Sequence, residues 1–272
     1  MYKMKKAQRI GAISKILSDA PNKTFTLKYF CDLFGAAKSS LSEDVHMVRE
    51  LFEELGLGLV ETTSGAGGGI RYVPHISASE AEKVLTELCE RLNDGSRILG
   101  SGFLYTSDIM FDAALMRKVA MVFARRFASS GAEYVATIET KGIPAAVMTA
   151  YMLNLPLIVI RREAKVSEGS TMSINYFSGS TDHMQRMSVA RRAVVPGGKV
   201  LIIDDFMRAG GSVKGIAEIL TESGMQIVGT GVIIASAVPE KKKISDYTPL
   251  IYLDNVDETS KQISLFPNSQ IF

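Results

Sequence analysis

From about residue 100 onwards, strand-like apolar runs alternate with helical segments, and this alternation limits the fold more than any other feature of the sequence. The strand-like runs read YVATIET, LPLIVIRR, STMSINYF, KVLIIDD, IVGTGVIIASA and PLIYLDN. Helical patterns over residues 113–127, 143–153 and 212–222 lie between several of them. The alternation predicts an α/β fold, with a parallel sheet flanked by helices and a ligand at the carboxyl ends of the strands.

One of these runs, KVLIIDDFMRAGGSV at residues 199–213, ends on two neighbouring acids, Asp204 and Asp205. Burying charge is costly, so a carboxylate pair at the end of an apolar strand indicates a ligand site. The RAGGS loop leads into a helix that starts near Ser212, where backbone N–H groups form a nest for a phosphate. Gly210 and Gly211 let the backbone approach the anion without a Cβ in the way. Carboxylates suit sugar hydroxyls, or a magnesium ion reached through waters, so the segment predicts a site for a phosphorylated sugar.

The segment VLIIDDFMRAGGS resembles the thirteen-residue signature of type I phosphoribosyltransferases, which bind phosphoribosyl pyrophosphate (PRPP). IETKGIPAA resembles the pyrophosphate loop of that family, and RREAKVSEGSTMSINYFSGS sits where the family has a hood loop. Arg161, Arg162 and Lys165 of the hood segment are expected to reach the pyrophosphate, although a solvated basic loop explains them nearly as well. The resemblance implies that the PRPP-binding residues are Thr140, Lys141, Gly142, Arg162, Lys165, Asp204, Asp205, Arg208, Ala209, Gly210, Gly211, Ser212 and Val213.

Three short helices and a hairpin are predicted before residue 75. The helices cover residues 6–17, the segment TLKYFCDLFG and the segment AKSSLSEDVHMVRELFEELG. Thr26 is the expected cap of the second helix and Gly35 its end, while Ser40 with Glu43 forms a capping-box pattern for the third. Ser39 and Ser42 are alternative caps. The positions expected to form the apolar faces are Ile10, Ile13, Ile16, Leu17, Leu27, Phe30, Leu33, Phe34, Val45, Val48, Leu51, Phe52 and Leu55.

Two β-capable runs, LVETT and IRYVP, flank a glycine-rich tip at residues 65–69 and predict a hairpin. Helix, helix, helix and hairpin describe a winged helix-turn-helix, whose third helix enters a DNA major groove. Residues 1–42 carry eight basic residues against two acidic ones, a net charge of +6 in a chain whose net charge is +2, which leaves −4 for the remainder. A basic end on an acidic body indicates nucleic acid or an anionic surface, and a solvated basic helix face explains the charge alone equally well.

The predicted DNA contacts follow from this fold. The start of the third helix supplies a lysine and serines, which mostly hold phosphates rather than read bases. The hairpin and the first helix add backbone contacts. The residues are Lys5, Lys6, Arg9, Lys38, Ser39, Ser40, Ser42 and Arg71.

A winged helix joined to a PRPP-binding domain resembles the purine operon repressors of Gram-positive bacteria, across nearly the whole chain. PNK, AKSSLSEDV, GAGGGIRYVP, TKGIPAA, EGSTMSINY and DDFMRAGG all fit that family. The resemblance implies a winged-helix domain at residues 1–75 and a phosphoribosyltransferase-like effector domain at residues 76–272. It also implies a cytoplasmic homodimer that binds purine-gene control regions and releases them when PRPP binds. Guanosine tetraphosphate is implied as a competing ligand, and a related activator leaves the sign of regulation open.

Arg208 departs from the enzyme pattern. The hypoxanthine–guanine transferases have an aspartate there, and an arginine cannot accept a proton at neutral pH as a general base. The expectation is therefore a non-catalytic homologue that needs no cofactor, with PRPP as effector and Mg²⁺ as its companion. An active xanthine-like phosphoribosyltransferase is the alternative, because IIDDF is also close to the xanthine enzymes. A protein-binding module on an inactive transferase fold is the third.

The remaining features of the sequence exclude several other classes. No run of 18 apolar residues predicts a membrane span, and the basic N-terminus lacks the apolar stretch of a secretory signal. Cys31 and Cys89 are far apart and the chain has three histidines, which argues against a disulfide framework or a zinc site. No metal is expected on direct protein ligands. Residues 77–93 form a further helix for which core packing is preferred over a domain or subunit junction, with Ala81, Val84, Leu85, Leu88 and Leu92 on one stripe.

Overall fold

The computed structural model describes residues 4–65, 68–177 and 184–272. It divides into two compact units. The first comprises residues 1–77 with 151–154, and the second comprises residues 78–150 with 155–272. No helix among the described residues is long and apolar enough to cross a membrane.

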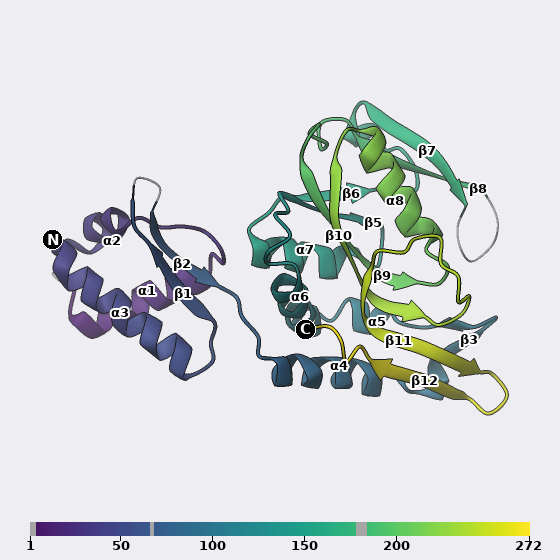
Figure 1. The fold of residues 1–272 in the computed structure, drawn as a ribbon, viewed down its shortest axis with the longest axis horizontal. Coiled ribbons are helices and arrows are strands. Elements are labelled where there is room, and N and C mark those ends of the chain that lie inside the picture. The colour runs from purple at the N-terminus through teal and green to yellow at the C-terminus, as the bar shows by residue number, and fades with distance from the viewer. Residues whose placement is uncertain (1–3, 66–67, 178–183) are drawn as a thin grey trace. The chain divides into compact units, whose positions relative to one another are not determined.

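The first unit is the expected winged helix-turn-helix (Figure 1). Its helices are α1 (Lys6–Ser18), α2 (Leu27–Phe34) and α3 (Lys38–Glu54), and the antiparallel strands β1 (Leu59–Thr63) and β2 (Gly69–Val73) form the wing. Residues 66 and 67 of the expected hairpin tip lie outside the described residues. One apolar core joins the five elements, and its fully buried members are Ile13, Leu17, Phe30, Leu41 and Val48.

Two of the expected helix ends are confirmed and one cap is wrong. Thr26 accepts a hydrogen bond from the Tyr29 amide as N-cap of α2, and Gly35 ends that helix at φ 60°. The N-cap of α3 is Ala37, which makes no side-chain cap, so Ser39, Ser40 and Ser42 all lie inside the helix. Leu41 lies on the buried stripe of this helix, together with Val45, Val48 and Phe52.

Three leucines expected in the core of the first unit are exposed instead. They are Leu33 at 47%, Leu51 at 41% and Leu55 at 61% exposure. The stripe of apolar residues in the sequence is wider than the face that each helix buries. Helices of 8 and 17 residues pack only a narrow face against so small a core.

The second unit is built on a six-stranded sheet in the order β12-β11-β10-β9-β5-β6 (Figure 1). Strands β5 to β11 in this sheet run parallel, which confirms the expected fold class, and only the edge strand β12 is antiparallel. The bounds are β5 (Tyr134–Ile138), β6 (Leu157–Ile160), β9 (Lys199–Met207), β10 (Gln226–Ser236), β11 (Thr248–Asp257) and β12 (Gln262–Pro267). The C-terminal segment therefore closes one edge of the sheet.

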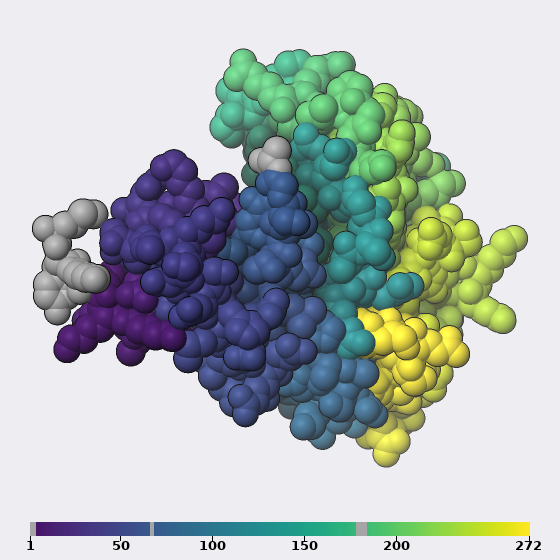
Figure 2. All heavy atoms as spheres, turned by 60° about the vertical axis from the view of Figure 1, so that its left-hand side comes forward, coloured from purple at the N-terminus to yellow at the C-terminus, as the bar shows by residue number. Residues whose placement is uncertain are grey.

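Helices cover this sheet, as the alternation predicted. They are α4 (Ala78–Leu92), α6 (Ala113–Arg126), α7 (Ile143–Leu153) and α8 (Gly211–Glu222). All five apolar positions expected on α4 are buried. This helix packs on β11 and β12, where blue and yellow surfaces adjoin in Figure 2, so core packing explains its stripe.

Several short elements were not expected from the sequence. A turn of 3₁₀-helix (Gly95–Arg97) leads into the two-stranded hairpin of β3 (Ile98–Gly100) and β4 (Phe103–Leu104), followed by α5 (Ser107–Met110). A second 3₁₀ turn (Val166–Glu168) precedes β7 (Thr171–Phe177). The strand β7 was expected from the run STMSINYF, but it lies outside the main sheet and pairs antiparallel with β8 (Met184–Ala190). Residues 178–180 of the expected hood segment lie outside the described residues.

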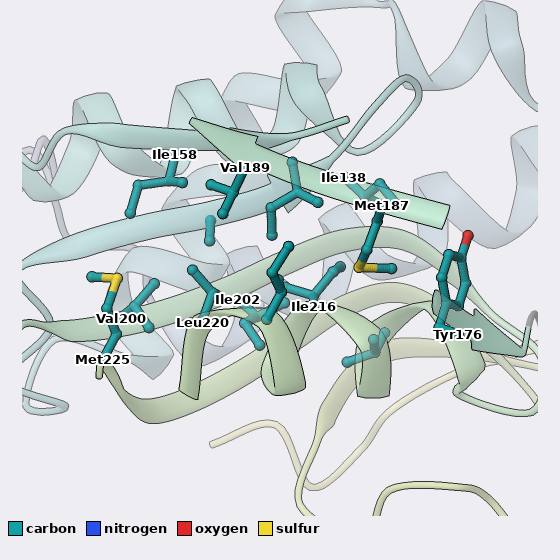
Figure 3. Packing of buried hydrophobic residues seen from close by; sticks show 14 of the residues in the cluster. Ile138, Ile158, Tyr176, Met187, Val189, Val200, Ile202, Ile216, Leu220 and Met225 are labelled. Atoms are coloured by element: carbon teal, nitrogen blue, oxygen red, sulfur yellow. The ribbon is translucent and has the colours of Figure 1, made fainter. Parts of the chain in front are cut away.

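The core of the second unit fixes α8 against the sheet and against the β7–β8 hairpin (Figure 3). A Cβ on Gly215 would lie 2.6 Å from Met187 Cε, so α8 approaches the hairpin closely. The packing fixes both ends of the loop that joins β9 to α8. The core residues labelled in Figure 3 are Ile138, Ile158, Tyr176, Met187, Val189, Val200, Ile202, Ile216, Leu220 and Met225.

Candidate functional site

The acid pair lies near the carboxyl end of β9, between the neighbouring strands β10 and β5. Asp204 is only 3% exposed, and its Oδ1 accepts a hydrogen bond from the Asp205 amide at 3.0 Å. Asp205 lines a cavity of about 200 Å³. The structure thus gives the two acids different surroundings, with Asp205 on the cavity and Asp204 buried in the strand.

Burial raises the pKa of both carboxyl groups. For Asp204 the negative charge of Asp205 raises the pKa further, and the positive charge of Arg162 opposes the rise. For Asp205 the rise is opposed by the hydrogen bond with Asp204 and by the charge of Lys141. A buried pair of this kind holds protons tightly and favours hydroxyl donors or a cation as partners.

The loop after β9 presents backbone N–H groups to the same cavity. Gly210 has φ 82° and is the N-cap of α8, a conformation that glycine adopts without strain. The amides of residues 209–213 donate no hydrogen bond to any described residue, and the first intrahelical bond runs from the Lys214 amide to the Gly210 carbonyl. Free N–H groups at a helix start form an anion site. The cavity is lined by Gly102, Phe103, Leu104, Thr106, Lys141, Asp205, Phe206, Met207, Arg208, Ala209, Gly210, Gly211, Ser212 and Val213.

The loop between β5 and α7 brings a cation to this cavity. Lys141 Nζ donates to Thr106 Oγ1 at 3.2 Å, and Lys141 lines the cavity with Asp205. Gly142 packs directly on Asp204, since a Cβ there would lie 2.4 Å from Thr137 Oγ1 and 2.7 Å from Asp204 Oδ1. Thr140, before them, is exposed and follows a cis peptide bond from Glu139. The loop at residues 140–142 and the loop after β9, which are far apart in the sequence, thus meet at this cavity.

If the cavity binds PRPP as the sequence predicts, replacing Gly142 by alanine is expected to weaken that binding roughly tenfold or more, because the added methyl group must displace Asp204 or the loop, at a cost of about 1–3 kcal/mol. Titration calorimetry with PRPP measures the effect. The control is Gly11→Ala, where the added Cβ meets nothing within 4 Å. Equal PRPP affinity in Gly142→Ala and the wild type would contradict the close fit of this loop.

Sequence reasoning missed one wall of the cavity, the segment 102–106. The β3–β4 turn places Gly102, Phe103 and Leu104 on the cavity, and Thr106 holds Lys141. Ser101 and Gly102, at φ 52° and 70°, form the two-residue turn. The signal was present in the run ILGSGFL, in which a Ser-Gly pair with a preceding glycine joins two apolar pairs.

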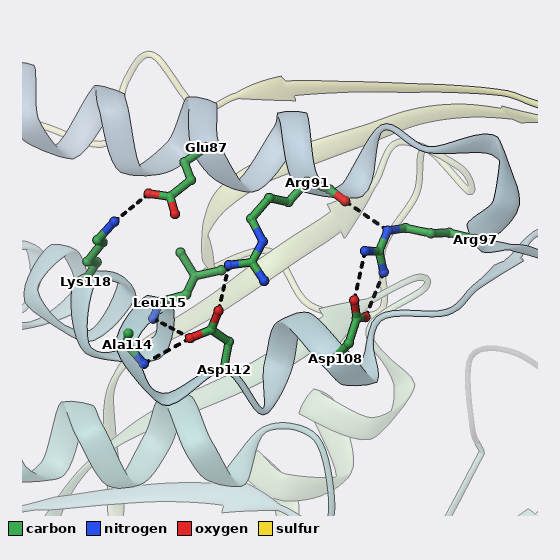
Figure 4. A network of polar contacts seen from close by, with 8 residues as sticks. All are labelled: Glu87, Arg91, Arg97, Asp108, Asp112, Ala114, Leu115 and Lys118. Atoms are coloured by element: carbon green, nitrogen blue, oxygen red, sulfur yellow. Dashed lines mark hydrogen bonds and ion pairs between the residues drawn. The ribbon is translucent and has the colours of Figure 1, made fainter.

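A polar network anchors this wall to α4 and to the start of α6 (Figure 4). Arg97 donates two hydrogen bonds to the Asp108 carboxylate, at 2.7 and 2.9 Å, and one to the Arg91 carbonyl. Arg91 in turn pairs with Asp112, the N-cap of α6, at 2.7 Å. The Arg97 side chain is 14% exposed, so the network is a partly buried clamp that fixes residues 97–108 as one piece.

The hood cations are placed differently from one another. Arg161 forms ion pairs with Glu139 and Glu168, at 3.1 and 2.9 Å. Its guanidinium therefore joins the end of β5 to the 3₁₀ turn at Val166–Glu168, whereas the sequence predicted that it would reach a pyrophosphate. Arg162 donates to Gln185 and lowers the pKa of Asp204, which places its charge near the acid pair. Lys165 is exposed, 4.0 Å from Glu163.

Comparison with known proteins identifies the family. A family model described as "Bacterial purine repressor, N-terminal" matches residues 5–74, and one described as "Phosphoribosyl transferase domain" matches residues 111–266. The purine biosynthesis transcriptional repressor PurR of Bacillus subtilis is 36% identical over 263 residues, which cover 97% of this chain and 92% of that protein. The chain belongs to the PurR family of purine biosynthesis regulators.

The PurR family includes regulators of both signs. The purine biosynthesis transcriptional activator PurR of Lactococcus lactis is 33% identical over 262 residues, covering 96% of this chain and 97% of that protein. A solved adenine phosphoribosyltransferase from Thermoanaerobacter pseudethanolicus shares the fold of the second unit, with a TM-score of 0.53 and 19% identity over 61% of this chain and 98% of that one. Family membership therefore decides the fold and leaves the direction of regulation open.

In this PurR-family chain the first unit carries a groove between α2, α3 and the wing. Lys38 and Ser42 line it, with Thr62 to Gly65 and residues 68–70 on the wing side. Ser39 is exposed and Ser40 is half-buried on the first turn of α3. Two further residues of α3, His46 and Arg49, line the groove and were missed, because the sequence pattern had assigned importance only to the start of the helix.

The basic residues outside α3 differ in how free their charges are. Lys5 and Lys6 are exposed at the start of α1. The ion pair of Lys6 with Glu43 is long, at 4.0 Å from Nζ to Oε2. Arg71 on the wing pairs with Glu61 at 2.7 Å but stays 43% exposed. Arg9 does not lie on the surface as expected of a DNA contact, since its Nε donates to the fully buried Asp44 at 2.6 Å and its Nη1 to the Met4 carbonyl. The structure therefore corrects the prediction for Arg9, whose guanidinium neutralises a core carboxylate of the PurR-type winged helix.

Proposed function

We propose that this regulator of purine biosynthesis genes binds PRPP in the cavity of its second unit, and that PRPP weakens the binding of DNA by its first unit. The observation that carries the proposal is the cavity itself. Free N–H groups of residues 209–213, the Asp205 carboxylate and the Lys141 ammonium line one space. These groups suit the 5′-phosphate, the ribose hydroxyls and the pyrophosphate of a single molecule.

Mg²⁺ would accompany the pyrophosphate rather than sit on a protein cage. Within the described ranges no group of three or more His, Cys, Asp or Glu side chains is arranged to hold a metal ion. Asp205 can reach a magnesium ion through waters, which is the usual mode for Mg²⁺ bound to substrate phosphates. Thr140, Arg162 and Lys165 complete the proposed PRPP-binding set on the pyrophosphate side.

Guanosine tetraphosphate is proposed as a competitor for the same cavity, because it also carries pyrophosphate groups on a ribose. The test is competition, in which guanosine tetraphosphate displaces PRPP with a simple shift of the PRPP titration midpoint. Binding of both ligands together would place it elsewhere.

We propose that the second unit does not catalyse phosphoribosyl transfer. Arg208 lines the cavity where a general base would be needed, and a guanidinium holds its proton at neutral pH. Steady release of pyrophosphate from PRPP mixed with hypoxanthine, guanine, xanthine or adenine would instead support the transferase alternative.

The proposed DNA-binding residues are Lys5, Lys6, Lys38, Ser39, Ser40, Ser42 and Arg71, joined by His46 and Arg49 from the groove. Helix-turn-helix regulators generally bind two half-sites as dimers, and we propose a homodimer here. Light scattering coupled to size-exclusion chromatography tests that assembly.

Addition of PRPP and Mg²⁺ is expected to raise the Kd for a purine-gene promoter fragment by roughly 5- to 150-fold, the usual range of allosteric coupling. Fluorescence anisotropy of the labelled fragment measures it. Potassium chloride with Mg²⁺ at matched ionic strength is the control, because added salt alone weakens DNA binding. The coupling is reciprocal, so the fragment must weaken PRPP binding by the same factor. An unchanged Kd at saturating PRPP would refute the proposal.

A further inference from the structure

The loop after β9 is braced from its outer side by the segment 237–247, which joins β10 to β11. Lys242 Nζ donates to the Arg208 carbonyl at 2.7 Å and to the Ser236 carbonyl at 2.5 Å. The Lys243 amide donates to the Ala209 carbonyl at 2.8 Å. Two successive carbonyl groups of the loop, those of Arg208 and Ala209, therefore point away from the cavity and into this brace.

Those two contacts also fix the direction of the next two amides. In a planar trans peptide the C=O and the following N–H point in opposite directions. A carbonyl of Arg208 held on the outside turns the Ala209 N–H inward, and a carbonyl of Ala209 held on the outside turns the Gly210 N–H inward. Both residues line the cavity, and neither amide donates to a described residue.

The second acceptor of Lys242, the Ser236 carbonyl, belongs to the main sheet. Ser236 is the last residue of β10, which pairs in parallel with β9 along its length up to Ala235 and Met207. The Ser236 hydroxyl is itself bonded to the Val238 carbonyl, and the Ala237 amide to the Leu253 carbonyl. Lys242 thus joins the glycine-containing loop of the site to the end of a central strand.

We propose that Lys242 is a positioning residue of the effector site, which holds the 208–210 backbone so that its amides face the 5′-phosphate and which adds a positive charge behind that phosphate. The inference rests on the proposed function, because it concerns how the same cavity takes PRPP. Lys242 forms no ion pair with a carboxylate among the described residues, and burial lowers the pKa of its ammonium. Because both hydrogen bonds of Lys242 go to backbone carbonyls, its side chain is placed to orient the loop that contains Arg208.

The neighbouring lysine provides a matched control. Lys241 is exposed, whereas Lys242 is half-buried. Lys241→Met removes the same charge one residue away without touching the loop. Lys242→Met removes the two hydrogen bonds while keeping an unbranched side chain, and Lys242→Arg restores donors and charge.

The experiment measures the Kd of PRPP, ribose 5-phosphate and pyrophosphate for the full chain and these three variants by titration calorimetry. Lys242→Met is expected to bind PRPP and ribose 5-phosphate roughly tenfold or more weakly, by the same factor, because hydrogen bonds from a charged donor are lost at the 5′-phosphate loop. Its pyrophosphate affinity stays that of the wild type. Lys241→Met binds all three ligands as the wild type does, and Lys242→Arg recovers part of the loss.

Two results would overturn the role of Lys242 but leave the proposed function intact. The first is equal PRPP affinity in Lys242→Met and the wild type. The second is equal weakening of all three ligands in Lys242→Met, which indicates general damage to the unit. Thermal unfolding of each variant accompanies the titrations, and Lys242→Arg decides the outcome if Lys242→Met fails to fold. A wild type that binds neither PRPP nor ribose 5-phosphate refutes the proposed function, and the inference falls with it.

Discussion

Asp205→Ala is expected to lower the affinity for PRPP on the order of 100-fold and to abolish the release of DNA by PRPP, while DNA binding without PRPP stays unchanged. The carboxylate lines the cavity and is the acceptor available to the ribose hydroxyls. Two charge-assisted hydrogen bonds at about 1.5–3 kcal/mol each are sufficient for a loss of that size. Calorimetry gives the PRPP affinity, and anisotropy with the promoter fragment gives the DNA response.

Asp204→Asn is the companion variant that separates the two acids. Its amide keeps the oxygen that accepts the Asp205 N–H and removes the buried charge. We expect a smaller loss of PRPP affinity than in Asp205→Ala, because Asp204 is not among the residues that line the cavity. If Asp205→Ala still released DNA on addition of PRPP, the effector would bind elsewhere in the chain.

The same companion variant is expected to be more stable than the wild type at neutral pH. Burial, with the charge of Asp205, raises the pKa of Asp204 well above its ordinary value near 4. The folded chain then binds protons more tightly than the unfolded chain, so the contribution of this group to stability is full below the unfolded pKa. That contribution is lost as the pH rises through the folded pKa. Unfolding of both proteins at pH 4.5 and pH 7.5 should show the advantage of Asp204→Asn growing with pH.

Arg9→Met is expected to destabilise the winged-helix unit by about 3–5 kcal/mol, the usual cost of leaving one buried charge without its partner. Asp44 is fully buried on α3, and its Oδ2 accepts the Arg9 Nε hydrogen bond at 2.6 Å. Its Oδ1 has no hydrogen-bond partner among the described residues, so the loss of Arg9 strands the whole carboxylate. Calorimetric unfolding and hydrogen exchange of the α1 and α3 amides measure the effect.

The double variant Arg9→Met with Asp44→Leu distinguishes a core role for Arg9 from a DNA contact. Replacing both members of a buried pair by apolar groups is generally neutral or stabilising, so the double variant should recover the fold and its DNA affinity. Lys6→Met, an exposed lysine on the same helix, serves as the control for simple loss of charge. A double variant that folds fully but no longer binds DNA would restore Arg9 as a contact.

Local chemistry explains why so much of the site followed from the sequence. The acid pair, the glycine turn and the helix start are consecutive in the chain, so a pattern of neighbouring residues sufficed to place Asp205 and Gly210 on one cavity. The core helices also followed, because apolar residues recur at helical spacing on α4, α6 and α8. The remaining features depend on partners far away in the chain. Arg9 meets Asp44 across 35 residues, and no local pattern in a basic N-terminus distinguishes a buried guanidinium from an exposed one.

The start of α3 shows the same limit in a different form. Three serines near the expected boundary favoured a capped start, but the helix begins at Lys38 after Ala37, which makes no side-chain cap. Capping is a local preference of only about 1 kcal/mol, so it does not by itself fix where a helix begins. Lys242 and Thr106 also escaped prediction, since each acts on a loop that lies 34 or 35 residues away.

The cavity wall at residues 102–106 affects where a fragment of this protein can begin if its cavity is to stay intact. The recognisable transferase sequence begins at residue 111, and the recognisable repressor head ends at residue 74. The stretch between them matches neither, yet it supplies one side of the cavity and the Arg97 clamp that fixes it. An isolated second unit should therefore start before Ala78, because a fragment trimmed to the familiar transferase core would leave its cavity open to water on that side.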